Sequence, residues 1–596
     1  MKLLKRTNVA TGMPATSQRC VFHTTACVCA LFVAALALFS APVFAQSNSL
    51  VDRLPADTWA YINWHGTSSL NSVSSTNSVL RLWSDPSFAS LRTRLVSRIT
   101  QGGNQTNPQA AAMAQMLANE VLSALENPAV VGFLNRPAGG LASGKSNPIG
   151  FFFVFDATGK QNIVNLLRHR QEMSGVPAIR TPLPVGDVTA EKVESNGNVS
   201  YDAQVGNYFI STDTFAALME LVPRFSSSQP PATSFDKAPD VPSACRNDGQ
   251  PSIADLFVLP SRLHVASAPP SPDFDIHAFA TSLHLDRIHA VCGRMSFGEQ
   301  VTRWHGVILG DTSQGSVLDI FGDNQDSFAT LALAPSVSSF QSSVLNFAAF
   351  YNSVFNAVTA ALPANRSAIV MAMTTFLSSS WGMPPDQALG LFTGEVTSIR
   401  PDPVANPSDT LYALTIRNPE KLLPILQHAF PGERASAKQL GDTTYITLAL
   451  GAPSASTPDP PALYMALTPT MLLASHQRER LNEALARLHP ASGSAPVDVI
   501  SRNPDFLKAR AVLPAKLDSL SYTNFARYNW QELFADLEKN INEQAQAAAK
   551  AANKQPPPSF DWIQGFDASV ISRYLHFSVG GAWKDSSGIY FDSYIQ

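Results

Sequence analysis

The sequence predicts an α+β protein made of two related modules, each a mostly antiparallel sheet with helices on one face, followed by a C-terminal long helix and a hairpin. Two observations predict this fold. Short apolar strand patterns are interleaved with helical stripes, and the order strand, helix, hairpin, helix occurs twice. The expected parts are an export signal at 1–45, a first module at 46–225, a connection at 226–280, a second module at 281–500 and a C-terminal part at 501–596.

An export signal is predicted at the start of the chain. Four basic residues come first: Lys2, Lys5, Arg6 and Arg19. An uncharged, mostly apolar run, 26–45, follows and ends at the small-residue site Val43-Phe44-Ala45. We therefore expect cleavage after Ala45 and a periplasmic or extracellular location in a bacterium. The run is long enough to span a bilayer, so an inner-membrane anchor formed by an uncleaved signal is the alternative.

The composition limits the kinds of partner. The 596 residues are 45% apolar and 15% charged, with a formal net charge of −4, whereas about 25% of residues are charged in typical soluble domains. A nucleic-acid partner is not expected, because binding one needs a basic face. No later segment reaches the length of a membrane helix, so no transmembrane helix is expected in the mature chain. A cell-envelope component or an apolar ligand is the expected partner, and no cofactor is expected.

The two modules are recognised by matching patterns. In the first, the apolar strand 151–155 leads into a helix with apolar residues at 163, 164, 166 and 167. In the second, the strand 411–414 leads into a helix with apolar residues at 422, 423, 425 and 426. The shared spacing is that of a core-facing helical stripe. Each copy continues with a strand pair and a further helix, which ends near Leu221 or Leu485.

The remaining elements follow in chain order. Ala/Ser-rich helical regions at 107–126 and 343–379 precede the two copies and are expected to cover a sheet face. The connection is rich in Pro and Ser, with a short ordered piece around 253–259. A hairpin is expected from strands 283–297 and 301–309. The C-terminal helix opens with the capping pair Asn529 and Glu532, and strands 574–579 and 588–594 form the closing hairpin.

Cys245 and Cys292 are the cysteines that remain after signal cleavage. An even number of cysteines in an oxidising compartment predicts one disulfide between them.

The segment Leu54-Pro55-Ala56-Asp57-Thr58, followed by the aromatic strand 59–64, resembles the start of the mature domain in a family of exported bacterial proteins of unknown function. The segment Leu391-Phe392-Thr393-Gly394-Glu395-Val396 resembles a second recurrent element of that family. The resemblance implies an envelope protein and supplies no catalytic residues.

Candidate metal ligands lie in the histidine-rich stretch after the connection. In an extended segment, Asp273, Asp275 and His277 would share one face, and such ligands suit a divalent cation. No zinc-type spacing is present, so solvated linker residues are the favoured interpretation. A tripeptide also recurs, as Trp64-His65-Gly66 and Trp304-His305-Gly306. Its separation does not match the offset between the modules, which favours coincidence.

No constellation of residues in the sequence identifies a reaction, and no catalytic residue can be named. We expect an exported envelope protein of non-enzymatic binding or structural type. One alternative is a carrier of lipid or another apolar ligand in a cavity between sheet and helices. The residues expected to line that cavity are Phe151, Phe153, Leu411 and Ala413. A second alternative is a hydrolase whose catalytic site is assembled from distant residues.

Overall fold

The computed structural model describes most of the chain from residue 50 onward. The described residues are 50–101, 120, 123–135, 149–169, 177–195, 197–245, 252–262, 274–313, 317–322, 325–336, 339–400, 410–429, 435–449, 462–489, 498–551, 559, 563 and 565–596. The export signal expected at 1–45 and most of the helical region expected at 107–126 lie outside them.

Strands dominate the architecture. The first ten are β1 (Thr58–Trp64), β2 (Ala129–Asn135), β3 (Ile149–Asp156), β4 (Ile179–Val185), β5 (Val188–Ser195), β6 (Asn198–Val205), β7 (Tyr208–Thr212), β8 (Ser252–Val258), β9 (Ile288–Phe297) and β10 (Thr302–Gly310). The others are β11 (Ser339–Val344), β12 (Phe392–Arg400), β13 (Leu411–Ile416), β14 (Ala435–Leu440), β15 (Thr443–Ala449), β16 (Ala462–Leu467), β17 (Met471–Ser475), β18 (Ser519–Asn524), β19 (Phe577–Asp585) and β20 (Gly588–Ile595).

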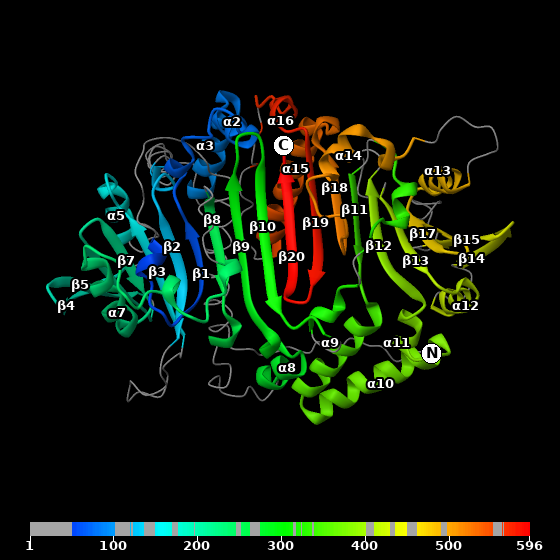
Figure 1. Cartoon of the computed structure of the whole chain (residues 1–596), viewed down its shortest axis with the longest axis horizontal. Coiled ribbons are helices and arrows are strands. Elements are labelled where there is room, and N and C mark those ends of the chain that lie inside the picture. The colour runs from blue at the N-terminus through cyan, green and yellow to red at the C-terminus, as the bar shows by residue number, and fades with distance from the viewer. Residues whose placement is uncertain are drawn as a thin grey trace.

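These strands form one antiparallel sheet of twenty strands within the described residues. The pairing runs β4-β5-β6-β7-β3-β2-β1-β8-β9-β10, then β20-β19-β18-β11-β12-β13-β17-β16-β15-β14. Read outward from the centre, the two halves have the same order, with each strand of the second half ten numbers above its counterpart. The halves meet where β10 pairs with β20, in the middle of Figure 1.

Thirteen α-helices accompany the sheet in the part of the chain that the structure describes. They are α2 (Ser78–Ser84), α3 (Pro86–Gln101), α5 (Gln161–Arg168), α7 (Phe215–Ser226), α8 (Ile276–Ser282), α9 (Phe347–Ala361), α10 (Ala364–Trp381), α11 (Pro385–Leu389), α12 (Pro419–Ala429), α13 (Arg478–Leu488), α14 (Pro504–Arg510), α15 (Trp530–Ala551) and α16 (Ser569–Tyr574). In Figure 1, α8 to α11 gather below the strands, and α2, α3 and α16 lie above them.

Helices lie on both faces of the outer parts of the sheet, so the expectation of helices on one face is wrong. In the first half, Val154 of β3 packs in one core cluster with Leu218 of α7, whereas its neighbour Phe155 packs in another with Val164 of α5. Successive strand residues point to opposite faces. The continuous apolar run of β3 therefore needs cover on both sides. The second half is arranged similarly, with α13 against one cluster and α12 against another.

The Leu54–Thr58 segment forms a turn that opens β1. Leu54 is fully buried in the core, and the backbone N–H and hydroxyl of Thr58 both donate to the carbonyl of Pro55, at 3.1 and 2.8 Å. Buried polar groups need such partners. The segment has a structural role at the entry to the sheet.

The segment 391–396 also has a structural role, at the start of β12. Gly394 has φ +107°, and a Cβ there would lie 2.5 Å from the Leu345 carbonyl oxygen. The buried carboxylate of Glu395 accepts hydrogen bonds from the backbone N–H groups of Ala329 and Thr330, each at 3.0 Å, and from the Thr330 hydroxyl. This carboxylate ties the 3₁₀ helix Ala329–Leu333 to β12.

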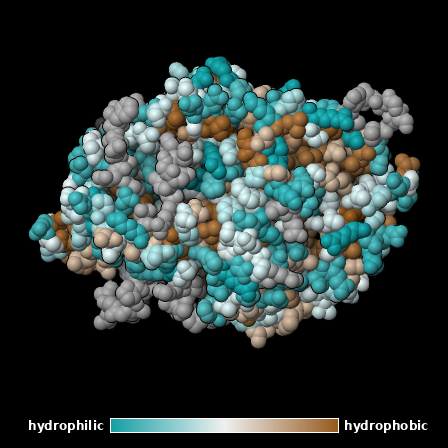
Figure 2. All heavy atoms as spheres, viewed as in Figure 1, coloured by the Kyte–Doolittle hydropathy of each residue, from teal (hydrophilic) through white to brown (hydrophobic). Residues whose placement is uncertain are grey.

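Apolar residues also reach the surface. Figure 2 shows them as patches among hydrophilic residues on the face seen in Figure 1, consistent with the low charge content. Among the described residues, no helix combines the length and the apolar character needed to cross a membrane.

Candidate functional site

A row of polar side chains crosses the centre of the sheet. Five residues are directly opposite one another on adjacent strands: Asn63 of β1, Asp255 of β8, Arg294 of β9, His305 of β10 and Asp592 of β20. Residues paired in this way in an antiparallel sheet project from the same face. We call these five residues the central polar row.

Asp255 anchors one side of the row. Its Oδ1 accepts a hydrogen bond from Nε of Arg294 at 2.9 Å, and its Oδ2 accepts one from Nε2 of His65 at 2.5 Å. Burial acts to raise the pKa of Asp255, but the hydrogen bond and charge of His65, together with those of Arg294, hold the pKa below its ordinary value. Asp255 is therefore an ionised carboxylate that is held by two donors.

Asp592 anchors the other side. Nε and Nη2 of Arg303 donate to its two oxygens, each at 3.0 Å, in a bidentate pair. Nδ1 of His305 donates to Oδ1 at 2.8 Å. Burial acts to raise the pKa of Asp592, yet the hydrogen bonds and charges of His305 and Arg303 lower it overall. The same design, one buried carboxylate between an arginine and a histidine, therefore occurs twice at the centre of the sheet.

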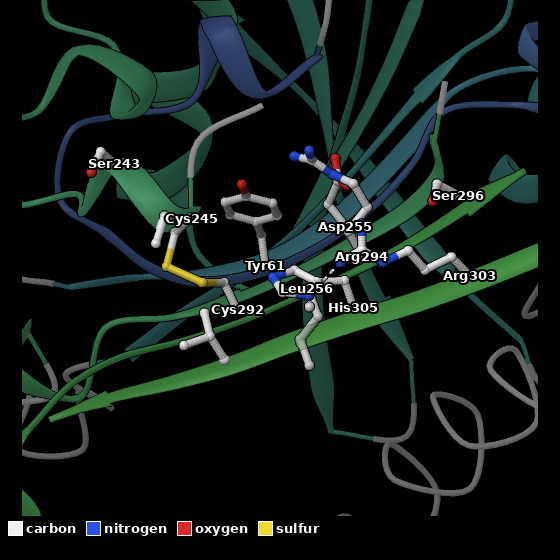
Figure 3. Close-up of a pocket in the computed structure, with 13 residues that line it drawn as sticks. Tyr61, Ser243, Cys245, Asp255, Leu256, Cys292, Arg294, Ser296, Arg303 and His305 are labelled. Carbon is white, nitrogen blue, oxygen red and sulfur yellow. Dashed lines mark hydrogen bonds and ion pairs between the residues drawn. A yellow bond between two sulfur atoms is a disulfide. The ribbon is translucent and has the colours of Figure 1, made fainter. Parts of the chain in front are cut away.

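A cavity of about 220 Å³ lies over this face. In Figure 3, the Cys245–Cys292 disulfide and Tyr61 stand at one end, whereas Arg303 and Ser296 stand at the other. The short 3₁₀ helix Ser243–Cys245 forms a wall, tied to β9 by the disulfide. The cavity is below the roughly 300–1,000 Å³ of pockets that enclose drug-sized ligands. It suits a small molecule or one end of a larger one.

The expected disulfide is present. Cys245 and Cys292 are bonded, with their Cα atoms 5.6 Å apart. The sulfurs line the cavity, so the cross-link also holds part of the candidate site.

The four predicted ligand-contacting residues lie elsewhere. Leu411 and Ala413 are buried against the helices of the second half. Phe151 packs on Phe133, with ring centroids 5.7 Å apart, and Phe153 packs against the cluster under α5. The lining of the central cavity contains none of the four. Their role in ligand binding stays a prediction.

Two of the three metal candidates, Asp275 and His277, lie at a helix start instead of in an extended segment. Oδ1 of Asp275 accepts hydrogen bonds from the backbone N–H groups of His277 and Ala278, at 2.9 and 3.0 Å, and so caps α8. Asp273 lies outside the described residues. Among those described, no three His, Cys, Asp or Glu side chains are grouped to hold a metal ion.

Sequence reasoning missed the central polar row. It attributed the repeated Trp-His-Gly tripeptide to coincidence, yet both histidines bind a buried aspartate. The first tripeptide begins at the last residue of β1 and the second lies within β10. These strands are not counterparts in the two halves, so the duplication does not explain the recurrence. The strand sequences did contain a pattern that could have indicated these ion pairs. Asp255 and Arg294 are charged residues within otherwise apolar strand patterns, where a buried charge needs a partner.

This chain has no match among family models, curated proteins or solved structures.

Proposed function

We propose that this chain is an exported, non-enzymatic binding protein and that the central cavity is its ligand site. The observation that carries the proposal is the central polar row together with its partners His65 and Arg303. In this cluster two carboxylates, Asp255 and Asp592, orient two arginines and two histidines beside a cavity. Burying ion pairs costs desolvation free energy and is weak evidence for stability. Such a cluster is more readily explained as a preorganised recognition surface.

A binding role without catalysis fits the hydrogen bonds of the two histidines. The partners of His65 and His305 within the described structure are asparagine, arginine and aspartate side chains. A nucleophile activated by histidine would be a hydroxyl or thiol within hydrogen-bond reach of the ring. The nearby cysteines are joined in a disulfide.

Export is supported by two features. The N-terminal sequence has the basic, apolar and small-residue parts of a signal, and disulfides persist in oxidising compartments outside the cytosol. An uncleaved signal that anchors the chain remains the alternative location.

We further propose that the two halves are copies of one ancestral unit. The shared strand order supports this, as do the turns that join β4 to β5 and β14 to β15. Both turns are Gly-Asp pairs, at 186–187 and 441–442, and both glycines have positive φ, +60° and +64°. The cavity then lies beside the junction of the two copies, where β10 meets β20.

A plug in the cavity tests the proposal. Ala244 is exposed and lines the cavity, so Ala244→Trp should fill it without disturbing the core. The mature protein would be incubated with a small-molecule extract of bacterial envelopes, and retained molecules identified by native mass spectrometry. We expect a retained molecule that Ala244→Trp loses and that Ala360→Trp, an exposed control on α9, keeps. Equal retention by all three proteins, or none by the wild type, would refute the proposal.

A hydrolase is the second candidate, favoured by one observation. The Nδ1–carboxylate bond of His305 to Asp592 is the orientation used by histidines that act as general bases. Turnover of p-nitrophenyl esters that Asp592→Asn abolishes would favour this candidate. The lipid carrier remains an alternative that the small volume of the central cavity disfavours.

A further inference from the structure

We infer that the ligand of the central cavity is a small organic anion, a carboxylate with a short apolar body. This inference rests on the proposed function and names the chemistry that the cavity recognises.

On the Asp592 side of the site, the acceptor group lies behind the donor groups. The side chain of Asp592 is only 6% exposed, whereas those of Arg303 and His305 are 41% and 34% exposed, and both donors line the cavity. Asp255 also lines the cavity, and it is paired there with Arg294, at 13% and 16% exposed. A ligand on the Asp592 side therefore meets a guanidinium and an imidazole before it meets a carboxylate.

These outer groups favour an anion. A guanidinium carries N–H donors and no acceptor, so Arg303 keeps its positive charge and presents no acceptor to a ligand while Nε and Nη2 bind Asp592. His305 uses Nδ1 to bind Asp592, so Nε2 is the ring nitrogen that this carboxylate does not engage. Arg294 adds a second positive charge to the cavity lining.

A cationic ligand is disfavoured by the state of the two carboxylates. Both oxygens of Asp255 already accept hydrogen bonds from Arg294 and His65. Both oxygens of Asp592 are taken by Arg303, with His305 as a further donor. A cation would have to displace an arginine from a buried carboxylate, which leaves a charge without its partner.

The other end of the cavity favours an apolar body. Ala244, Cys245, Cys292, Tyr61 and Val307 line it. Tyr61, Cys292 and Val307 are buried, so this end presents mainly the apolar side chains of Ala244 and Cys245. Together with the small volume, this lining favours one short aliphatic or aromatic group attached to the anion.

Calorimetric titration with matched probes tests the inference. Benzoate has the proposed chemistry, benzamide has the same shape without the charge, and inorganic phosphate has charge without an apolar body. We expect saturable binding of benzoate, at least tenfold tighter than that of benzamide or phosphate. Tighter binding of benzamide or phosphate than of benzoate would overturn the inference, as would no binding of benzoate.

A double variant assigns the binding to this site. Arg303→Gln with Asp592→Asn replaces the ion pair by a neutral amide pair and avoids leaving a buried charge unpaired. It should weaken benzoate binding at least tenfold. Arg180→Gln, which breaks the Arg180–Glu191 pair on β4 and β5, should bind as the wild type does. Unchanged binding by the double variant, at unchanged thermal stability, would contradict the inference.

The envelope-extract experiment distinguishes failure of the anionic-ligand inference from failure of the proposed binding function. A retained molecule that is neutral or cationic, and that Ala244→Trp loses, would refute the anion while the binding function stands. Retention that Ala244→Trp does not change would refute the binding function itself.

Discussion

At the scale of single residues, the buried carboxylates distinguish this molecule. Glu395 and Asp592 are buried and the side chain of Asp255 is 13% exposed. Each lies within the sheet and accepts several hydrogen bonds. Asp255 and Asp592 hold arginine and histidine side chains beside the cavity, and Glu395 holds the backbone of a 3₁₀ helix. Their partners come from distant parts of the sequence, so the residue types could be read from the sequence but their pairing could not.

The pKa of Asp592 predicts a pH dependence of stability. Its folded-state pKa is lowered by His305 and Arg303 against the opposing effect of burial, so it lies below the unfolded-state value. Such a group contributes stability that is fully present above the unfolded pKa and is lost as pH falls through the folded pKa. We expect the free energy of unfolding to fall as the pH is lowered from about 5 to about 2. Urea unfolding of Asp592→Asn should show a shallower fall in that range.

The matched control for this experiment is Asp326→Asn, because Asp326 is largely exposed and lies 3.9 Å from Lys516. Its stability should follow the wild-type pH curve. Identical curves for Asp592→Asn and Asp326→Asn would mean that the pair with Arg303 and His305 is not formed in solution.

Glu395→Gln should destabilise the protein by about 2 kcal/mol, because buried hydrogen bonds to a charged acceptor contribute about 1.5–3 kcal/mol. The amide nitrogen of glutamine would also face backbone N–H donors. Chemical unfolding measures the change. Glu483→Gln removes exposed ion pairs with Arg480 and Arg487 and should change stability by less than about 0.5 kcal/mol. Equal effects of both substitutions would contradict the assigned role of Glu395.

At the scale of elements, the sequence predicted helices and hairpins well where a single short segment contains the alternation or the capping residues that define them. The hairpin of β9 and β10 turns at Gly298 as its alternation predicts, and the backbone N–H of Glu532 is capped by Asn529 at 3.3 Å. The ordered piece expected around 253–259 is present as β8, although composition did not show that it is a central strand of the sheet. The extended segment expected around Asp275 and His277 is wrong, because Asp275 caps α8 and His277 lies in that helix.

The helix α10 has no buried residue and carries a row of exposed apolar side chains. Ile369, Met373 and Phe376 follow the spacing i, i+4, i+7 and are all exposed. Such a stripe should bind an apolar fluorescent dye. Met373→Gln with Phe376→Gln is expected to reduce dye fluorescence at unchanged thermal stability, whereas Thr375→Gln with Ser379→Gln on the same helix should leave it unchanged. Dye binding that is equal in both variants would show that the stripe is covered in solution.

At the scale of the whole molecule, the sheet depends on pairings that join distant parts of the chain. His305 and Asp592 are 287 residues apart, and β8 inserts between β1 and β9. The repeated pattern in the sequence predicts two similar units, but it says nothing about which strands meet at the centre. The central polar row forms only because β1, β8, β9, β10 and β20 are adjacent in the sheet. Short sequence patterns could not predict that adjacency, so they could not predict the row.

The β10–β20 pairing predicts that the molecule can be cut between its halves. Fragments 46–313 and 314–596, produced together, should co-purify, because eight residue pairs join β10 to β20. Size-exclusion chromatography with mass detection reports the complex. Shortening the second fragment to 314–586 removes β20 and should weaken co-purification, whereas the packing of α2 and α3 on α16 stays in place. Separate elution of the two full fragments would contradict a sheet that is continuous across its centre.

The central claim is that the cavity over β8, β9 and β10 holds a small ligand beside Arg303 and His305. A crystal structure of the mature protein soaked in benzoate tests it most directly. The account predicts difference density for one benzoate, with its carboxylate at Arg303 and its ring toward the Cys245–Cys292 disulfide. Density for water alone in the cavity at saturating benzoate would contradict the account.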